Sequence, residues 1–294
     1  YLMFGCHKRV VDVDTYDLTN VGARAIMFVN VIVLATDIRS RARAMWLAVS
    51  SKFGLVAAAL SVAMISGCGY YHYATPLRPA DGQQSSMSIA DDGSITFTQD
   101  RLEVRLRPMT DEELNRQFAS HSASGPKSTN PYTYGDTEFW EGQQERTRFT
   151  VFRLSVKNYA YPKVKIDPSR IQLVASNNRE YWSLGKQQMD TYYRAYAIGY
   201  RGNEYNRYQE RMDLLNRTMF KNEEIFSGQE KEGFVIFPAL HSDVRDINVT
   251  VHDCVLRFDY RNEPVEAVNI IYGFERDIGR KYGDAEPVIE TASK

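Results

Sequence analysis

The sequence predicts a mainly β protein, an antiparallel sandwich with an inserted helical hairpin and an N-terminal signal or anchor helix. Three observations lead to this fold class. About seven short runs between residues 86 and 276 have the alternation or apolar content of strands, and turn residues separate them. Residues 187–220 change to helical spacing. Most of the continuous apolar sequence lies before residue 68, and the remainder is polar.

The N-terminal segment has the layout of a signal peptide over residues 45–67. Met45 is the expected initiator, Lys52 supplies the positive charge of a short n-region, and residues 53–65 form an apolar run of signal-peptide length. This run is shorter than the roughly 20 residues that a membrane span requires, so cleavage is expected rather than an uncleaved anchor. Residues 1–44 are expected to be a non-translated or disordered leader.

Four residues close this segment and carry a specific resemblance. The tetrapeptide Ile65-Ser66-Gly67-Cys68 has the pattern Leu/Ile/Val, small, Gly/Ala, Cys, and it resembles the lipobox of bacterial lipoproteins. The resemblance implies that signal peptidase recognises Ile65, Ser66 and Gly67, and that Cys68 carries a diacylglycerol. The protein is then expected in the bacterial cell envelope, anchored by lipid. In enterobacteria an Asp after the cysteine signals inner-membrane retention, so Gly69 favours the periplasmic face of the outer membrane.

The lipidated cysteine is followed by a polar region with several turn signals. Prolines, glycines and polar residues predict a lipidated tether over residues 68–85. Residues 86–146 are expected to hold a β-hairpin, a strand, a short helix and a loop. The Asp-Gly pair at residues 92–93 predicts the hairpin turn, and alternation over residues 102–107 predicts the strand, which the following proline would end. A capping-box pattern at residues 110–113 opens the helix.

Residues 147–276 complete the predicted sandwich. Their order is a strand ending in Asn158, an Ile-Asp-Pro-x-x-Ile-x-Leu segment at 166–173, a Gly-Phe-Val-Ile-Phe strand from Gly233, and a final aromatic strand. This order resembles the immunoglobulin-like domains of small envelope lipoproteins of unknown function. The resemblance implies an immunoglobulin-like sandwich, without the Cys–Trp–Cys hallmark of true immunoglobulins, and it implies no particular chemistry. Residues 277–294 are expected to be a disordered tail.

The segment 187–220 is the most distinctive part of the predicted domain. Its spacing predicts an inserted helical hairpin, interrupted near Gly199 and Gly202. Because tyrosine and arginine are enriched in binding hot spots, six residues form a candidate partner-binding surface. The alternative is that the tyrosines pack on the sandwich. The candidate residues are Tyr192, Tyr196, Tyr200, Arg201, Tyr205 and Tyr208.

The sequence favours a protein that is not an enzyme. No metal-ligand pair at helical spacing, phosphate-binding glycine loop or nucleophile elbow occurs, so no metal and no cofactor beyond the lipid is expected. His252-Asp253-Cys254 holds the residue types of a thiol nucleophile, but in a regular strand His252 and Cys254 share one face while Asp253 points away. Cys254 is expected to be a buried small hydrophobe. The acidic residues expected to be turn residues rather than calcium ligands are Asp91, Asp92 and Asp100.

Charge excludes one class of partner. The 36 basic and 37 acidic residues nearly balance, and the part after residue 67 is net acidic. A nucleic-acid binder needs a basic face, so no nucleic-acid partner is expected. The expected function is that of a membrane-anchored lipoprotein whose non-catalytic sandwich binds or scaffolds an envelope protein or a glycan. Two alternatives stay open: an envelope hydrolase whose site is not visible in the sequence, and an accessory subunit of a secretion or transport complex.

Overall fold

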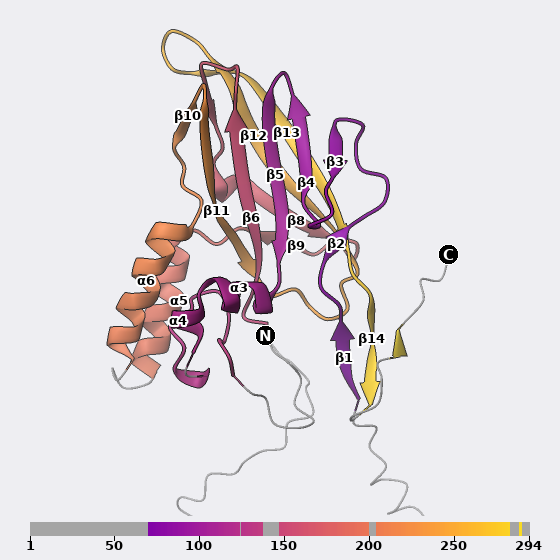
Figure 1. The fold of residues 1–294 in the computed structure, drawn as a ribbon, viewed down its shortest axis with the longest axis vertical. Helices are drawn as coiled ribbons and strands as arrows, with labels where there is room; N and C mark the ends of the chain where they lie inside the picture. The colour runs from indigo at the N-terminus through magenta and orange to yellow at the C-terminus, as the bar shows by residue number, and fades with distance from the viewer. Residues whose placement is uncertain (1–69, 124, 138–146, 200–203, 283–287, 290–294) are drawn as a thin grey trace, which may run out of the picture. The chain divides into compact units, whose positions relative to one another are not determined.

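The computed structural model describes residues 70–123, 125–137, 147–199, 204–282 and 288–289. The chain divides into two units, Tyr1–Cys68 and Gly69–Lys294, and all the described residues belong to the second unit. This unit is mainly antiparallel β structure arranged in several sheets, with helices between some of the strands (Figure 1).

The described elements follow one another along the chain as strands with two groups of helices between them. The strands are β1 (Tyr70–Ala74), β2 (Arg78–Pro79), β3 (Met87–Ile89), β4 (Ile95–Gln99), β5 (Leu102–Met109), β6 (Phe149–Asn158), β7 (Lys163–Lys165), β8 (Ile171–Ala175), β9 (Glu180–Trp182), β10 (Glu224–Phe226), β11 (Gln229–Pro238), β12 (Asp246–Phe258), β13 (Pro264–Glu275), β14 (Ile278–Tyr282) and β15 (Val288–Ile289). The helices are α3 (Asp111–Gln117), α4 (Ala119–Ser122), η1 (Gly125–Lys127), η2 (Pro168–Arg170), α5 (Lys186–Gly199) and α6 (Tyr205–Thr218).

One large sheet has five strands in the order β11-β6-β5-β4-β3. The predicted Asp-Gly hairpin is confirmed, since β3 pairs with β4 around a turn in which Gly93 has φ +76°. The strand predicted after it is also confirmed, but Pro108 does not end it. Pro108 pairs with Phe152 of β6, and the pairing with β4 ends at Leu106, so the proline meets no strand on that second side.

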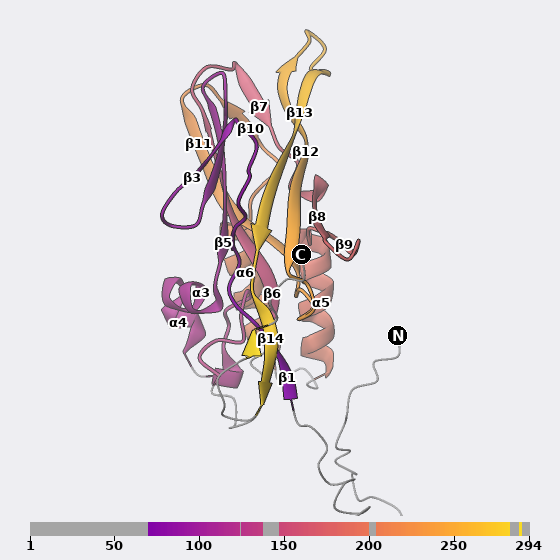
Figure 2. The ribbon, with the colours of Figure 1, turned by 90° about the vertical axis from the view of Figure 1, so that its right-hand side faces the viewer.

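The other large sheet has seven strands. Its main order is β10-β7-β12-β13-β2, and β8 joins it beside β12, with β9 beside β8. β12 and β13 form a long antiparallel hairpin whose register shifts between Val251 and Cys254 and again near Arg257. Figure 2 shows the two large sheets as two layers, with β5, β6 and β11 in one layer and β12 and β13 in the other.

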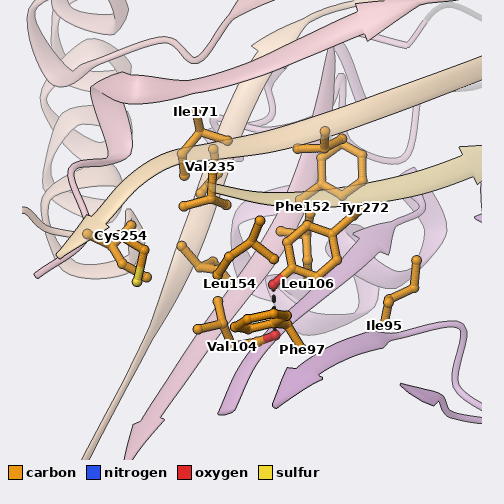
Figure 3. Packing of buried hydrophobic residues seen from close by; sticks show 14 of the residues in the cluster. Ile95, Phe97, Val104, Leu106, Phe152, Leu154, Ile171, Val235, Cys254 and Tyr272 are labelled. Atoms are coloured by element: carbon orange, nitrogen blue, oxygen red, sulfur yellow. Dashed lines mark hydrogen bonds between the residues drawn. The ribbon is translucent and has the colours of Figure 1, made fainter. Parts of the chain in front are cut away.

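One apolar core, here called the sheet core, joins the two large sheets. The ring of Phe152 on β6 lies 5.3 Å from that of Phe274 on β13, centroid to centroid. The hydroxyl of buried Tyr272 on β13 donates to the carbonyl oxygen of Val104 on β5 at 2.8 Å (Figure 3). Alternation along each strand points every second side chain into this core. The sheet core consists of Ile95, Phe97, Leu102, Val104, Leu106, Phe152, Leu154, Val156, Val164, Ile166, Ile171, Leu173, Ala175, Phe220, Ile225, Val235, Phe237, Val244, Ile247, Val249, Val251, Cys254, Leu256, Ile270, Tyr272 and Phe274.

A second apolar cluster, here called the helix core, lies on the opposite face of β6 and β11. Val151 and Ile236 pair across these strands and point away from the sheet core, whereas the neighbouring Phe152 and Val235 point into it. Helices α3, α5 and α6 cover the outward residues, and Figure 1 shows α5 and α6 beside β11. The helix core consists of Leu114, Tyr132, Phe149, Val151, Met189, Tyr193, Met212, Leu215, Phe234 and Ile236.

The first and last parts of the described unit pair with each other in a small third sheet. β1 and β14 are antiparallel neighbours, and β15 pairs with the other side of β14. The sequence predicts a tether over residues 68–85 and a disordered tail over 277–294, but the structure places strands in both segments. The pairing joins residues about 200 positions apart, so no local sequence pattern predicts it.

Candidate functional site

The predicted lipidation site lies directly before the described residues. The lipobox, residues 65–68, is outside them, so cleavage and lipidation stay predictions. β1 begins at Tyr70, and only Gly69 separates that strand from Cys68. The distance along the chain from the predicted lipidation site to the first strand is therefore much shorter than a tether over 68–85 would give.

Helix α5 buries a different stripe from the one that the tyrosine spacing suggests. Its buried residues are Met189, Tyr193 and Ala197, which recur every four positions. Tyr192 and Tyr196 therefore flank the buried face instead of forming it. Tyr192 is 40% exposed and its ring also contacts Phe149 of the helix core, at 5.2 Å between centroids. The tyrosines of α5 thus divide between core packing and the surface.

The other candidates for partner binding also divide. Tyr200 and Arg201 lie outside the described residues. Tyr205, at the first turn of α6, is 56% exposed. Tyr208 is half-buried, and its hydroxyl donates a hydrogen bond to the carboxylate of Asp190 on α5. The exposed aromatic surface that remains on the two helices is therefore carried by Tyr192 and Tyr205.

Tyr193 occupies the centre of the polar part of the helix core. Its hydroxyl accepts a hydrogen bond from Nη1 of Arg148 at 3.2 Å and donates to the carbonyl oxygen of Pro131. The guanidinium carbons of Arg211 and Arg148 lie 5.3 Å and 5.7 Å from its ring centroid. Burial raises the pKa of Tyr193 to about 12, so the phenol is neutral at physiological pH. It acts there as a hydrogen-bonding and cation–π partner.

Arg211 places a charge almost completely out of water. Its exposure is 1%, and its Nη2 donates to the carbonyl oxygen of Ser128 at 2.6 Å. Nη1 is 3.9 Å from Oε2 of Glu204, an ion-pair distance, and within the described part of the chain neither Nη1 nor Nε has a hydrogen-bond partner. Burial lowers the pKa of Arg211, although an arginine stays protonated. This arrangement holds α6 against the core and presents no reacting group.

The structure arranges His252, Asp253 and Cys254 differently from the regular strand that the sequence predicts. The register of β12 shifts between Val251 and Cys254, and Asp253 has φ +48°, so the strand is bulged at this point. The extra residue turns Cys254 into the sheet core, while His252 stays on the outer face. Prediction placed both on one face. Burial raises the pKa of the Cys254 thiol to about 12, which keeps it protonated, and its prediction as a buried residue is confirmed.

The predicted turn acids lie at the two ends of β4, with Asp91 and Asp92 in the turn before it and Asp100 after it. Asp92 accepts hydrogen bonds from the backbone N–H and the hydroxyl of Ser94, and the hydroxyl bond lowers its pKa. Asp100 lies at the other end of β4 and accepts from the hydroxyl of Tyr161. In the part of the chain that the structure describes, no group of three or more His, Cys, Asp or Glu could hold a metal ion. Within the same ranges, no helix is long and apolar enough to cross a membrane.

Comparisons of the chain with protein-family models, with curated proteins and with solved structures found no match. The functional reading therefore depends on the residues themselves. Sequence reasoning missed the buried roles of Arg148 and Arg211. Arg211 follows Tyr208 by three residues and precedes Leu215 by four, and this helical spacing was the available signal that its side chain could reach the core.

Proposed function

We propose that the protein is a membrane-anchored lipoprotein of the bacterial cell envelope, whose non-catalytic β-sandwich serves as a binding or scaffolding domain. One observation carries the proposal: a four-residue lipobox match, Ile65 to Cys68, ends an apolar run and stands two residues before the first strand. A chance match inside a folded domain would have neither an apolar run directly before it nor the first strand of a domain directly after it. The lipid is the only cofactor in this proposal.

A lipidated Cys68 is sufficient to hold the protein on a membrane. One acyl chain gives marginal binding, but two chains anchor stably, and a diacylglycerol supplies two. No spanning helix is then needed. The absence of Asp at Gly69 favours the periplasmic face of an outer membrane as the site of anchoring.

The anchor and the domain are close together along the chain. Two residue steps lead from Cys68 to Tyr70, and an extended chain covers at most about 7 Å over that distance. β1 is held by its pairing with β14, so this end of the small third sheet lies near the membrane surface in the proposed arrangement. A domain held in this way would present its other surfaces at a defined distance from the membrane.

The proposed sandwich is immunoglobulin-like, with α5 and α6 as an insertion. The support is that the chain crosses repeatedly between the two large sheets: β6 is followed by β7 in the other sheet, and β11 by β12. The two helices lie between β9 and β10 in the sequence. Exposed Tyr192 and Tyr205 make this insertion a candidate contact surface for an envelope protein or a glycan.

The lipid anchor is tested by metabolic labelling with an alkyne fatty acid in a bacterial host. The wild-type chain should incorporate label and should stay in the membrane pellet after a high-salt wash. Cys68→Ser should lose both properties. The matched control is Cys254→Ser, which removes a buried thiol and should keep the label. Equal labelling of Cys68→Ser and wild type would overturn the proposal.

A further inference from the structure

An open aromatic and polar row crosses the outer face of the seven-stranded sheet. The strand register aligns Trp182 of β9, Gln172 of β8, Thr250 of β12 and Ile271 of β13. Trp182 is 48% exposed and Ile271 is 40% exposed. Three strand spacings of about 4.8 Å make the row about 14 Å long. The row is therefore a strip on the sheet surface, longer than a single sugar ring, with an aromatic residue at one end.

The aromatic end of the strip carries planar hydrogen-bonding groups. The imidazole of His252 lies against the indole of Trp182, with ring centroids 5.9 Å apart and planes 29° apart. Nε2 of His252 donates to Oε1 of Gln172 at 3.1 Å, and Nε2 of Gln172 donates to Oε2 of Glu180 at 2.9 Å. An imidazole, an amide and a carboxylate thus lie in sequence beside an exposed indole.

The backbone of β12 is strained beside this cluster, and the strain determines which side chains face outward. Asp253 is a non-glycine residue with φ +48° inside a strand. Its N–H donates to Oδ1 of Asn269 at 2.9 Å, and its carboxylate pairs with Arg170. A bulge of this kind re-aims the neighbouring side chains, and such strain persists where the surroundings hold it. Here the bulge sends Cys254 inward and leaves His252 on the outer face beside Trp182.

The charges of the strip argue against a polyanionic ligand. Glu180 and Asp253 are acidic, and the only described arginine tied to the cluster, Arg170, is already paired with Asp253. A peptide added to the open edge of β9 would hydrogen-bond to the backbone in the plane of the sheet, whereas the side chains of the strip project from the face of the sheet. A ligand that has one apolar face and a rim of hydroxyls fits both the indole and the planar polar groups.

We propose that this strip, with Trp182, Gln172, His252 and Glu180 at its aromatic end, binds a linear, uncharged oligosaccharide with equatorial linkages. The indole stacks on the C–H face of a sugar ring, and the amide, imidazole and carboxylate hydrogen-bond to its hydroxyls. Equatorial linkages keep the chain extended, which matches a strip that crosses four strands in one direction. The inference rests on the proposal that the sandwich is a binding domain.

The test is isothermal titration calorimetry on the detergent-solubilised full chain, with chitohexaose, cellohexaose and the α-linked maltohexaose as probes. The wild-type protein should bind at least one of the first two, and should bind maltohexaose at least about tenfold more weakly. Trp182→Ala should weaken binding at least about tenfold, and His252→Ala should also weaken it. The matched control is Tyr260→Ala, which removes an 88% exposed aromatic residue from the β12–β13 hairpin and should change nothing.

Unfolding curves of the variants establish that each is folded. We expect folding to persist because the rings of Trp182 and His252 are partly exposed. No binding of chitohexaose and cellohexaose up to their solubility limits would overturn the inference, and so would binding that is insensitive to Trp182→Ala. A protein partner captured by a photocrosslinker at position 182, without oligosaccharide binding, would also overturn it. These outcomes are distinguishable from failure of the anchor, because Cys68→Ser should bind the oligosaccharide as the wild type does.

Discussion

The sheet core and the helix core lie on opposite faces of β6 and β11, yet they are built from different chemistry. The sheet core is apolar throughout, and the hydroxyl of Tyr272 is satisfied by a backbone carbonyl. The helix core surrounds Tyr193 with the buried guanidinium groups of Arg148 and Arg211. One pair of strands therefore supports an apolar layer on one side and a charged, aromatic layer on the other.

We expect the two cores to contribute differently, the sheet core to the stability of the fold and the helix core to the position of the helices. Apolar burial is the main favourable term in folding, so the sheet core is expected to carry most of the stability. A buried ion pair seldom repays its desolvation, and it is sensitive to the loss of either partner. We therefore expect the helix core to fix where α5 and α6 lie, at some cost in free energy. Four predictions test this contrast, from the largest expected effect to the smallest.

The largest effect is expected in the sheet core. Phe152→Ala removes a fully buried ring that contacts Phe237 and Phe274. It should lower the free energy of unfolding by about 3–5 kcal/mol, from lost burial and the cavity left behind. Urea denaturation followed by circular dichroism measures the change. Phe226→Ala, at a 48% exposed position, is the control and should cost much less; similar losses would contradict the assignment of the core.

Glu204→Ala should be the most costly charge substitution in the helix core. It leaves Arg211 buried without its carboxylate, and a loss of about 3 kcal/mol is expected. Glu210→Ala, at an exposed position of the same helix, should have an effect within about 0.5 kcal/mol.

The double variant Glu204→Ala/Arg211→Met sharpens this test. Methionine replaces the buried guanidinium with an apolar side chain, so most of the lost stability should return. If the double variant is less stable than Glu204→Ala alone, the arginine stabilises the helix core by itself.

Alkaline pH should destabilise the helix core through Tyr193. Its pKa is raised by burial from 10.0 to about 12, so the folded state favours the protonated phenol. The resulting contribution to stability, about 2–3 kcal/mol, is fully present below pH 10 and is lost as the pH rises through 12. Unfolding free energies of wild type and Tyr193→Phe between pH 8 and 12 measure it. A steeper fall for the phenylalanine variant than for wild type would contradict this explanation.

The smallest effect is expected where a helix begins. Thr110 caps α3, accepting from the N–H of Glu113 at 3.2 Å, while the Glu113 carboxylate accepts from the N–H of Thr110 at 3.1 Å. Thr110→Ala should cost about 1 kcal/mol in thermal or urea denaturation. Thr98→Ala, exposed on β4, is the control. Hydrogen exchange should show the loss first in α3, and unchanged exchange there would argue against the cap.

Features of the fold that depend on residue type or on neighbouring residues were predictable from the sequence. The Asp-Gly hairpin and the capping box at Thr110 each depend on a few neighbouring residues, and Cys254 was expected to be buried from its residue type alone. The chemistry of a turn, a cap or a small apolar side chain acts over that short range. Strand β5 follows for the same reason, because its alternating sequence matches one buried face.

Features set by distant parts of the chain were not predictable. The pairing of β1 with β14 joins the two ends of the described unit, and the short polar strands carry no signal for it. The bulge at Asp253 adds one residue to β12 and reverses the face of Cys254, which simple alternation cannot foresee. Residue type alone suggests that Arg211 lies on the surface, and its partners Glu204 and Ser128 are identified only by the structure.

The candidate contact surfaces show the same division. Spacing identified the tyrosines of α5 and α6, but their packing determines which ones are exposed, and Tyr192 and Tyr205 are. The strip around Trp182 and His252 brings together β9, β8 and β12, so it emerges only from the strand register.

The central claim is that Cys68 is the lipid-bearing first residue of the mature protein, and that its folded domain begins two residues later, at Tyr70. Mass spectrometry of the N-terminal peptide of membrane-extracted protein tests it most directly. We predict a peptide that starts at Cys68 and carries the added mass of a diacylglycerol, with or without a further acyl chain. An unmodified peptide that runs continuously from Gly67 through Gly69 would contradict the account.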